Sequence, residues 1–204
     1  MKALDPERQR VVLDSALKLF EQYPLKDITL DKLTKVSGVP AFDIIRHFQS
    51  SENILKAVLE RELELMAAVA QAPELRMPGE TIEDELRILA GVIFDQYRKR
   101  MQFMSKLMGE SLKDPKVGEL YYSTFIVQGR QLFAEFLRVR SEFGELQSGV
   151  DIEAASATFL ASLIGSLMTF ELFGGKHVET LDEERLLRQV CRTFLHGVAR
   201  SRVR

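Results

Sequence analysis

Hydrophobic residues recur at helical spacing along most of the chain. In the first segment Val12, Ala16, Leu19 and Phe20 share one face, which predicts a helix over about 7–23 that Pro24 ends. Comparable patterns, separated by Pro, Gly and capping residues, predict further helices over about 30–36, 40–48, 52–72, 81–100, 103–112, 115–140, 151–173 and 182–200. No segment alternates as a strand does. The pattern therefore predicts an all-α fold of about nine helices.

The second and third predicted helices are short and closely joined. Thr29 is placed to cap the second, Gly38 to end it, and Pro40 to occupy the first turn of the third. Ile44 and Phe48, four residues apart, then face inward together. Two short helices around a glycine turn are typical of a helix-turn-helix unit, although such corners also occur in ordinary helical bundles.

Composition narrows the class of protein. The 204 residues carry 28 Lys plus Arg against 30 Asp plus Glu, and this balance excludes a polybasic nucleic-acid coat. The 46% hydrophobic residues are enough for a real core, and the single cysteine excludes an intramolecular disulfide and fits a reducing compartment. The amino terminus has no secretory signal pattern and no uninterrupted apolar run reaches about 18 residues. We therefore expect a cytoplasmic protein without a membrane partner.

Five stretches of the amino-terminal region resemble the TetR-type (TetR/AcrR) transcriptional regulators. They are LDSALKLF (13–20), TLDKL (29–33), SGVP (37–40), IIRHF (44–48) and SSENIL (50–55). The resemblance implies a helix-turn-helix DNA-binding domain over 1–50 and a helical ligand-binding and dimerisation domain over 51–204. It also implies a double-stranded DNA operator, a small ligand and a homodimer as partners.

The residues expected to meet DNA lie on and around the third helix. They are Thr29, Pro40, Ala41, Phe42, Ile45, Arg46, His47 and Ser51. Apolar groups can read thymine methyls and arginine can pair with guanine, so a sequence-specific site is conceivable. In the alternative, Phe42 and Ile45 pack against a neighbouring helix and Thr29 only caps.

Several of these positions depart from the family pattern. Ile45 stands where a phosphate-binding Tyr is usual, Ser51 where a Lys is usual, and Phe42-Asp43 where a small polar pair is usual. Residues 28–50 carry a net charge of only +1. Because phosphate neutralisation dominates most DNA affinities, this favours few phosphate contacts or a loss of DNA binding.

The middle of the chain is rich in Met and aromatic residues, which suit a pocket for an apolar ligand. By resemblance the family's pocket lies among these helices, although such residues are as often simple core. The candidates for ligand binding are Phe94, Tyr97, Met101, Met104, Met108, Phe125, Gln128, Phe133 and Leu167.

The last two helices mix small and large apolar residues over more surface than one exposed helix needs. This favours a symmetric dimer. The interface candidates are Ala157, Ala161, Gly165, Leu187, Val190 and Phe194.

No motif of an enzyme is present. The three histidines, His47, His177 and His196, are far apart in sequence, and no phosphate loop, metal-ligand spacing or nucleophile elbow occurs. We therefore expect no catalysis, no cofactor and no metal. The leading hypothesis is a repressor released from its operator by a small apolar molecule. The alternative is a ligand-binding or protein-interaction module of the same fold with weakened or lost DNA binding.

Overall fold

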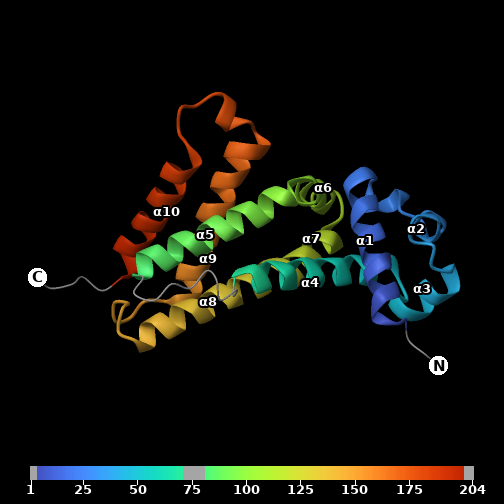
Figure 1. Ribbon diagram of the computed structural model, residues 1–204, viewed down its shortest axis with the longest axis horizontal. Helices are drawn as coiled ribbons and strands as arrows, with labels where there is room; N and C mark the ends of the chain where they lie inside the picture. Colours follow the sequence, from blue (N-terminus) through green and yellow to red (C-terminus); the bar gives the residue numbers. More distant parts are fainter. Residues whose placement is uncertain (1–3, 71–80, 200–204) are drawn as a thin grey trace, which may run out of the picture. The chain divides into compact units, whose positions relative to one another are not determined.

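The computed structural model describes residues 4–70 and 81–199, and these are mostly helical (Figure 1). In order, the α-helices are α1 Pro6–Gln22, α2 Leu30–Ser37, α3 Ala41–Phe48, α4 Ser51–Ala70, α5 Ile82–Lys99, α6 Met101–Ser111, α7 Pro115–Tyr121, α8 Val127–Glu142, α9 Ile152–Leu167 and α10 Glu183–Val198. Two 3-10 turns, η1 Leu25–Asp27 and η5 Gly175–His177, and two π turns, η3 Tyr122–Ile126 and η4 Met168–Leu172, complete them. With the continuous stretch 115–142 taken as one, the described residues form nine helices and no strand, which confirms the all-α prediction.

Capping side chains set where the helices begin. The Thr29 Oγ1 accepts the Lys32 N–H at 3.3 Å at the start of α2, and Thr81 and Asp84 form a reciprocal capping box at the start of α5. The hydrogen bonds from Thr81 lower the pKa of the Asp84 carboxyl. Pro40 differs slightly from the prediction. It is the residue before α3, because Ala41 is the first helical position.

Two π turns interrupt stretches that the periodicity predicts as plain α-helix. One lies between α7 and α8 and the other follows α9. Each π turn adds a residue to the helical repeat and so rotates the face that follows it. The break at Gly174-Gly175 matches the sequence pattern: Gly174 has a φ of +75°, and a Cβ at Gly175 would stand 2.9 Å from the Thr169 carbonyl oxygen.

The chain divides into two compact units, each made of two stretches of sequence. Unit 1 comprises 4–64 and 102–126 of the described residues, and unit 2 comprises 65–70, 81–101 and 127–199. Helix α4 therefore begins in unit 1 and ends in unit 2. A domain boundary at residue 50 stays a prediction.

In unit 1, α1, α2 and α3 form the blue group of Figure 1, and α1 is tied to α4. Ile44 and Phe48 are buried, as the i, i+4 pattern predicts. The Phe20 ring on α1 stacks on the Phe103 ring on α6, with centroids 6.1 Å apart. The Arg61 guanidinium on α4 lies 2.8 Å from the Asp14 carboxylate on α1. The last two contacts hold α1 against α4 and α6.

In unit 2, α5, α8, α9 and α10 pack around aromatic residues. The Phe159 ring on α9 lies 4.7 Å from the Phe133 ring on α8 and 4.8 Å from the Phe194 ring on α10, centroid to centroid. Arg98 at the end of α5 forms an ion pair with Glu171 at 3.0 Å. A second arginine, Arg140, pairs with Glu85. Aromatic packing and ion pairs thus join all four helices.

Candidate nucleic-acid interface and ligand site

The turn between α2 and α3 depends on a glycine in the left-handed region. Gly38 has a φ of +69°, and its N–H bonds to the Thr34 carbonyl oxygen at 2.8 Å, which closes α2. The Val39 N–H then donates to the Ser37 Oγ at 3.2 Å, and the Val39 side chain is buried. The turn is therefore fixed by local bonds and presents α3 in one orientation.

One face of α3 projects into solvent. Phe42 is 72% exposed and Ile45 is 52% exposed, so the packing of these two side chains against a neighbouring helix, which the sequence left open, is not what the protomer has. Ala41, Arg46 and His47 are half-buried beside them. The Arg46 guanidinium lies over the Phe42 ring, 5.5 Å from its centroid. The exposed surface is thus an apolar pair flanked by one arginine.

The bases of residues 28–50 are engaged inside the chain. Arg46 lies 3.3 Å from the Asp43 carboxylate, which also has Arg8 of α1 at 3.9 Å. Lys35 bonds to Asp31 at 2.8 Å, and this hydrogen bond raises the pKa of the Lys35 ammonium.

The third base is held by polar and aromatic groups. The Lys32 Nζ donates to the Asp27 carbonyl oxygen at 2.9 Å and lies 4.1 Å from the centroid of the Tyr23 ring. All three bases of residues 28–50 therefore already have partners within the chain.

The junction of α3 and α4 contains polar residues that were not among the predicted DNA-binding residues. Gln49 has a φ of +67°, a conformation uncommon outside glycine. The Ser50 Oγ accepts the Asn53 N–H at 3.1 Å, and the Asn53 Nδ2 donates to the Phe48 carbonyl oxygen at 2.8 Å. Ser50 preceding the helical pattern was the available signal. Three of the predicted DNA-binding residues, Thr29, Pro40 and Ser51, are exposed.

The predicted ligand-binding residues are mostly buried, with one exception. Phe94, Tyr97, Phe133 and Leu167 are buried in unit 2 with Met101 half-buried, while Met104 and Phe125 are buried in unit 1 with Met108 half-buried. Gln128 is exposed on α8, and its assignment to the ligand site stays a prediction. The π turn η3 lies just before it.

Tyr121, next to these residues in unit 1, carries an orphan hydroxyl. Its ring stacks on the Phe125 ring with centroids 5.7 Å apart, and the side chain is buried. Its hydroxyl has no hydrogen-bond partner among the described residues, and burial raises the pKa of the phenol to about 12. A buried unpaired hydroxyl costs roughly 1–3 kcal/mol, which a ligand or a water recovers by accepting a hydrogen bond from it.

The predicted interface residues fall into two groups. Ala161 and Gly165 are exposed on α9, and Ala157, Val190 and Phe194 are half-buried. Leu187 is buried in its own protomer, because it faces inward from α10, and so it cannot supply interface area.

The stretch Ile152–Leu172 is long and apolar enough to cross a membrane by length and composition alone, yet only 28% of its apolar window is buried in the protomer. Within 4–70 and 81–199, no group of three His, Cys, Asp or Glu side chains is arranged to hold a metal ion.

Residues 92–197 match the family model of the AefR-like transcriptional repressor, C-terminal domain. Among curated proteins, none matches the chain in sequence.

Several solved structures share the fold. A Mesorhizobium loti protein described as a TetR-family transcriptional regulator has 15% identity and a TM-score of 0.75, over 95% of this chain and 98% of that chain. The flavonoid-responsive regulator FrrA has 20% identity and a TM-score of 0.74, over 97% of this chain and 100% of its own. The fatty acid degradation regulator FadR from Bacillus halodurans has 16% identity and a TM-score of 0.72, over 96% and 98%.

Proposed function

Since the chain belongs to the TetR-type family of transcriptional regulators, we propose that it is a dimeric repressor released from its operator by a small apolar ligand. The observation that carries the DNA-binding half of this proposal is the exposed α3 face. Phe42 and Ile45 project, with Arg46 beside them, from the helix that follows the Gly38 turn. Apolar contact with thymine methyls and one arginine pairing with guanine would read sequence there.

The ligand half of the proposal is supported by burial and composition. The helices between residues 94 and 133 bury wide aromatic and Met side chains, and the Tyr121 hydroxyl lacks a partner among the described residues. An apolar molecule with one hydrogen-bond acceptor would suit such a site. The printed names of two similar structures refer to flavonoids and fatty acid degradation, which are chemically compatible with this class.

The proposed mechanism needs two copies. A symmetric dimer grips two half-sites only when its recognition helices stand about one DNA turn, roughly 34 Å, apart. Helix α4 begins directly after α3 and is joined to α1 by the pair of Arg61 and Asp14. A modest movement of α4 on ligand binding would therefore change the spacing of the two recognition helices and abolish DNA binding.

An anisotropy titration tests the proposal. The ligand-free protein is titrated at low salt against labelled DNA from its own upstream region and against a shuffled duplex of equal length. Tighter binding to the native sequence is expected. No difference between the two duplexes would overturn the repressor assignment.

A second candidate function is a ligand-binding or protein-interaction module of this fold that no longer binds DNA. Asp43, which holds Arg46, and the departures at Ile45 and Ser51 favour it. The double variant Ile45→Tyr with Ser51→Lys, which restores the usual family residues, separates the two. In a module without DNA binding it raises affinity from negligible to measurable. In a competent repressor it changes affinity only a few-fold.

A further inference from the structure

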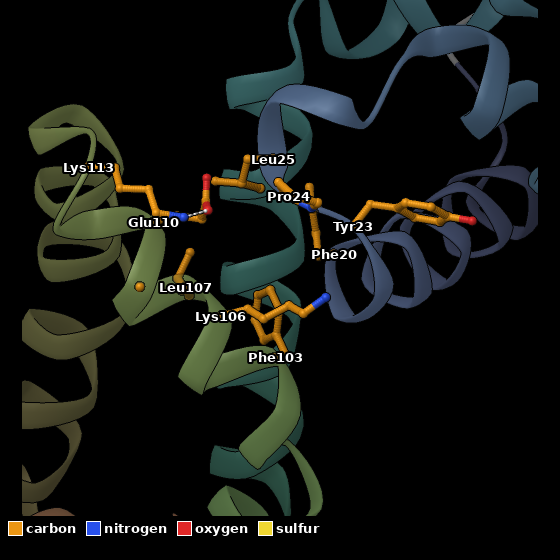
Figure 2. A pocket seen from close by; sticks show the side chains of 10 residues that line it. Phe20, Tyr23, Pro24, Leu25, Phe103, Lys106, Leu107, Glu110 and Lys113 are labelled. Atoms are coloured by element: carbon orange, nitrogen blue, oxygen red, sulfur yellow. Dashed lines mark hydrogen bonds and ion pairs between the residues drawn. The ribbon is translucent and has the colours of Figure 1, made fainter.

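Unit 1 contains a small cavity between the end of α1 and the second half of α6 (Figure 2). Its volume is about 300 Å³, which is the lower end of the range for small-molecule sites. Phe20, Pro24 and Leu25 line one side and Phe103 and Leu107 the other. None of the residues predicted for the main ligand pocket lines it.

The walls of this cavity are aromatic and rigid. Phe20 and Phe103 are buried and stack with interplanar angle 29°, so both rings have fixed orientations. Tyr23 also lines the cavity, but Figure 2 shows its ring pointing away from α6, and Lys32 of α2 lies over that ring. A flat aromatic body packs well against fixed rings, in offset-stacked or edge-to-face geometry.

The charges around the cavity are unequal. Lys113 and Glu110 pair at 2.9 Å, as the dashed line in Figure 2 shows, and largely cancel each other. Lys106, which also lines the cavity, has no acidic partner among the described residues. Figure 2 shows its side chain extending across the Phe103 ring toward α1. An ammonium at the edge of an apolar cavity attracts a carboxylate.

We propose that this cavity is a second ligand site, separate from the pocket among the middle helices, for a compact aromatic monocarboxylate. The aromatic body lies against Phe20 and Phe103, and the carboxylate pairs with the Lys106 ammonium. The site is built entirely within unit 1. Its existence does not depend on the proposed repressor function.

The cavity lies beside the segment that joins α1 to α2 of the helix-turn-helix unit. Tyr23 and Pro24 directly follow α1 and lead through η1 into α2, and the Tyr23 ring holds Lys32 of α2. A ligand bound next to Tyr23 therefore contacts the segment that positions α2. If the repressor proposal holds, occupancy changes operator affinity, but binding itself is measured without DNA.

Isothermal titration calorimetry with 2-naphthoate and the neutral 2-naphthamide tests the site. The carboxylate should bind at least about fivefold more tightly than the amide, since the amide lacks the charged hydrogen bond. Lys106→Gln should remove this preference. Lys18→Gln, at an exposed lysine of α1, is the matched control and should leave it intact.

A cavity-filling variant assigns the location. Gly109 lines the cavity, and a Cβ added there meets no atom within 4 Å, so Gly109→Leu is the variant chosen to fill the space. Replacing a helical glycine also favours the helix, so the thermal midpoint should not fall. Gly91→Leu on α5, a helical glycine that is equally unobstructed but does not line the cavity, is the control.

The expected result is that Gly109→Leu abolishes naphthoate binding while Gly91→Leu keeps it. Unchanged binding in Gly109→Leu, equal affinity for acid and amide, or no binding to the wild-type protein would each overturn the proposal. Because no DNA is present, a protein that binds naphthoate here but no operator contradicts only the repressor assignment.

Discussion

Two surfaces of the protomer expose apolar side chains, and they differ in relief and in charge. On α3 the exposed groups are large: Phe42 and Ile45 project beside Arg46. On α9 they are small, as at Ala161 and Gly165, within a stretch only 28% buried. The two large side chains on α3, beside the Arg46 guanidinium, suit a groove whose edge is negatively charged. The small residues on α9 allow another helix to approach closely. The exposure of apolar side chains alone therefore does not specify a partner. The size of these side chains and the charge beside them do.

The largest expected effect comes from a charge placed on the α9 surface. No atom lies within 4 Å of a Cβ added at Gly165, so Gly165→Arg fits the protomer but buries an unpaired charge in a dimer. Such burial costs about 3–5 kcal/mol, which raises the dimer dissociation constant at least about 100-fold. Sedimentation velocity measures it. Ser141→Arg, at an exposed position of α8, is the control, and an undiminished dimer in Gly165→Arg would disprove this interface.

The next effect removes the cation beside the α3 apolar pair. Arg46→Ala should weaken operator binding roughly 10–100-fold and weaken binding to shuffled DNA much less, because a guanine contact carries about 1–3 kcal/mol of discrimination. Anisotropy titrations on both duplexes measure the ratio. Lys35→Ala, which removes a base already paired with Asp31, should have a small effect on both duplexes. Equal losses on both duplexes in Arg46→Ala would make Arg46 a phosphate contact instead.

The variant Asp43→Asn tests the charge beside the α3 surface, because it removes the carboxylate that pairs with arginines there. The Asp43 carboxylate lies 3.3 Å from Arg46 and 3.9 Å from Arg8, so its neutralisation removes one negative charge beside two arginines near α3. Affinity for shuffled DNA should rise a few-fold, and the salt slope should steepen by about one per phosphate gained. Asp95→Asn on α5, which frees Lys99 instead, is the matched change of charge. A salt slope identical to that of the wild type would show that Asp43 does not mask these cations.

The smallest effect concerns the cap of α2. Thr29→Ala removes the acceptor of the Lys32 N–H and should lower the free energy of unfolding by about 1 kcal/mol in urea denaturation. Thr29→Ser keeps an oxygen in place and should lose less than half of that. If both variants are as stable as the wild type, the cap contributes nothing and the hydroxyl is free for a phosphate.

Most of the fold follows from local chemistry visible in the sequence. Helix starts at Thr29, Thr81, Asp151 and Asp182 are marked by capping side chains, and the ends by Pro24 and Gly38. The inward pair of Ile44 and Phe48 follows from its spacing. Such features need only residues within one or two turns of each other, so periodicity and capping predict them well.

The candidate sites follow from the sequence less well, because they depend on rotation and on distant pairs. Gln128 is exposed just after the π turn η3, and Leu187 faces inward from α10. The pairing of Asp43 with Arg46 has a recognisable i, i+3 spacing, whereas its contact with Arg8 depends on how α1 packs. The cavity joins Phe20 to Phe103, which no local pattern connects.

The central claim is that the apolar α3 surface, whose neighbouring bases are already paired within the chain, binds DNA through few phosphate contacts. The salt dependence of operator binding tests this claim most directly. If each head neutralises about two phosphates, a dimer gives a slope of log K against log salt of roughly −3 to −4. We expect sequence-dependent binding with a slope in that range. A slope of about −6 or steeper, or binding that does not distinguish the native duplex from the shuffled one, would contradict the account.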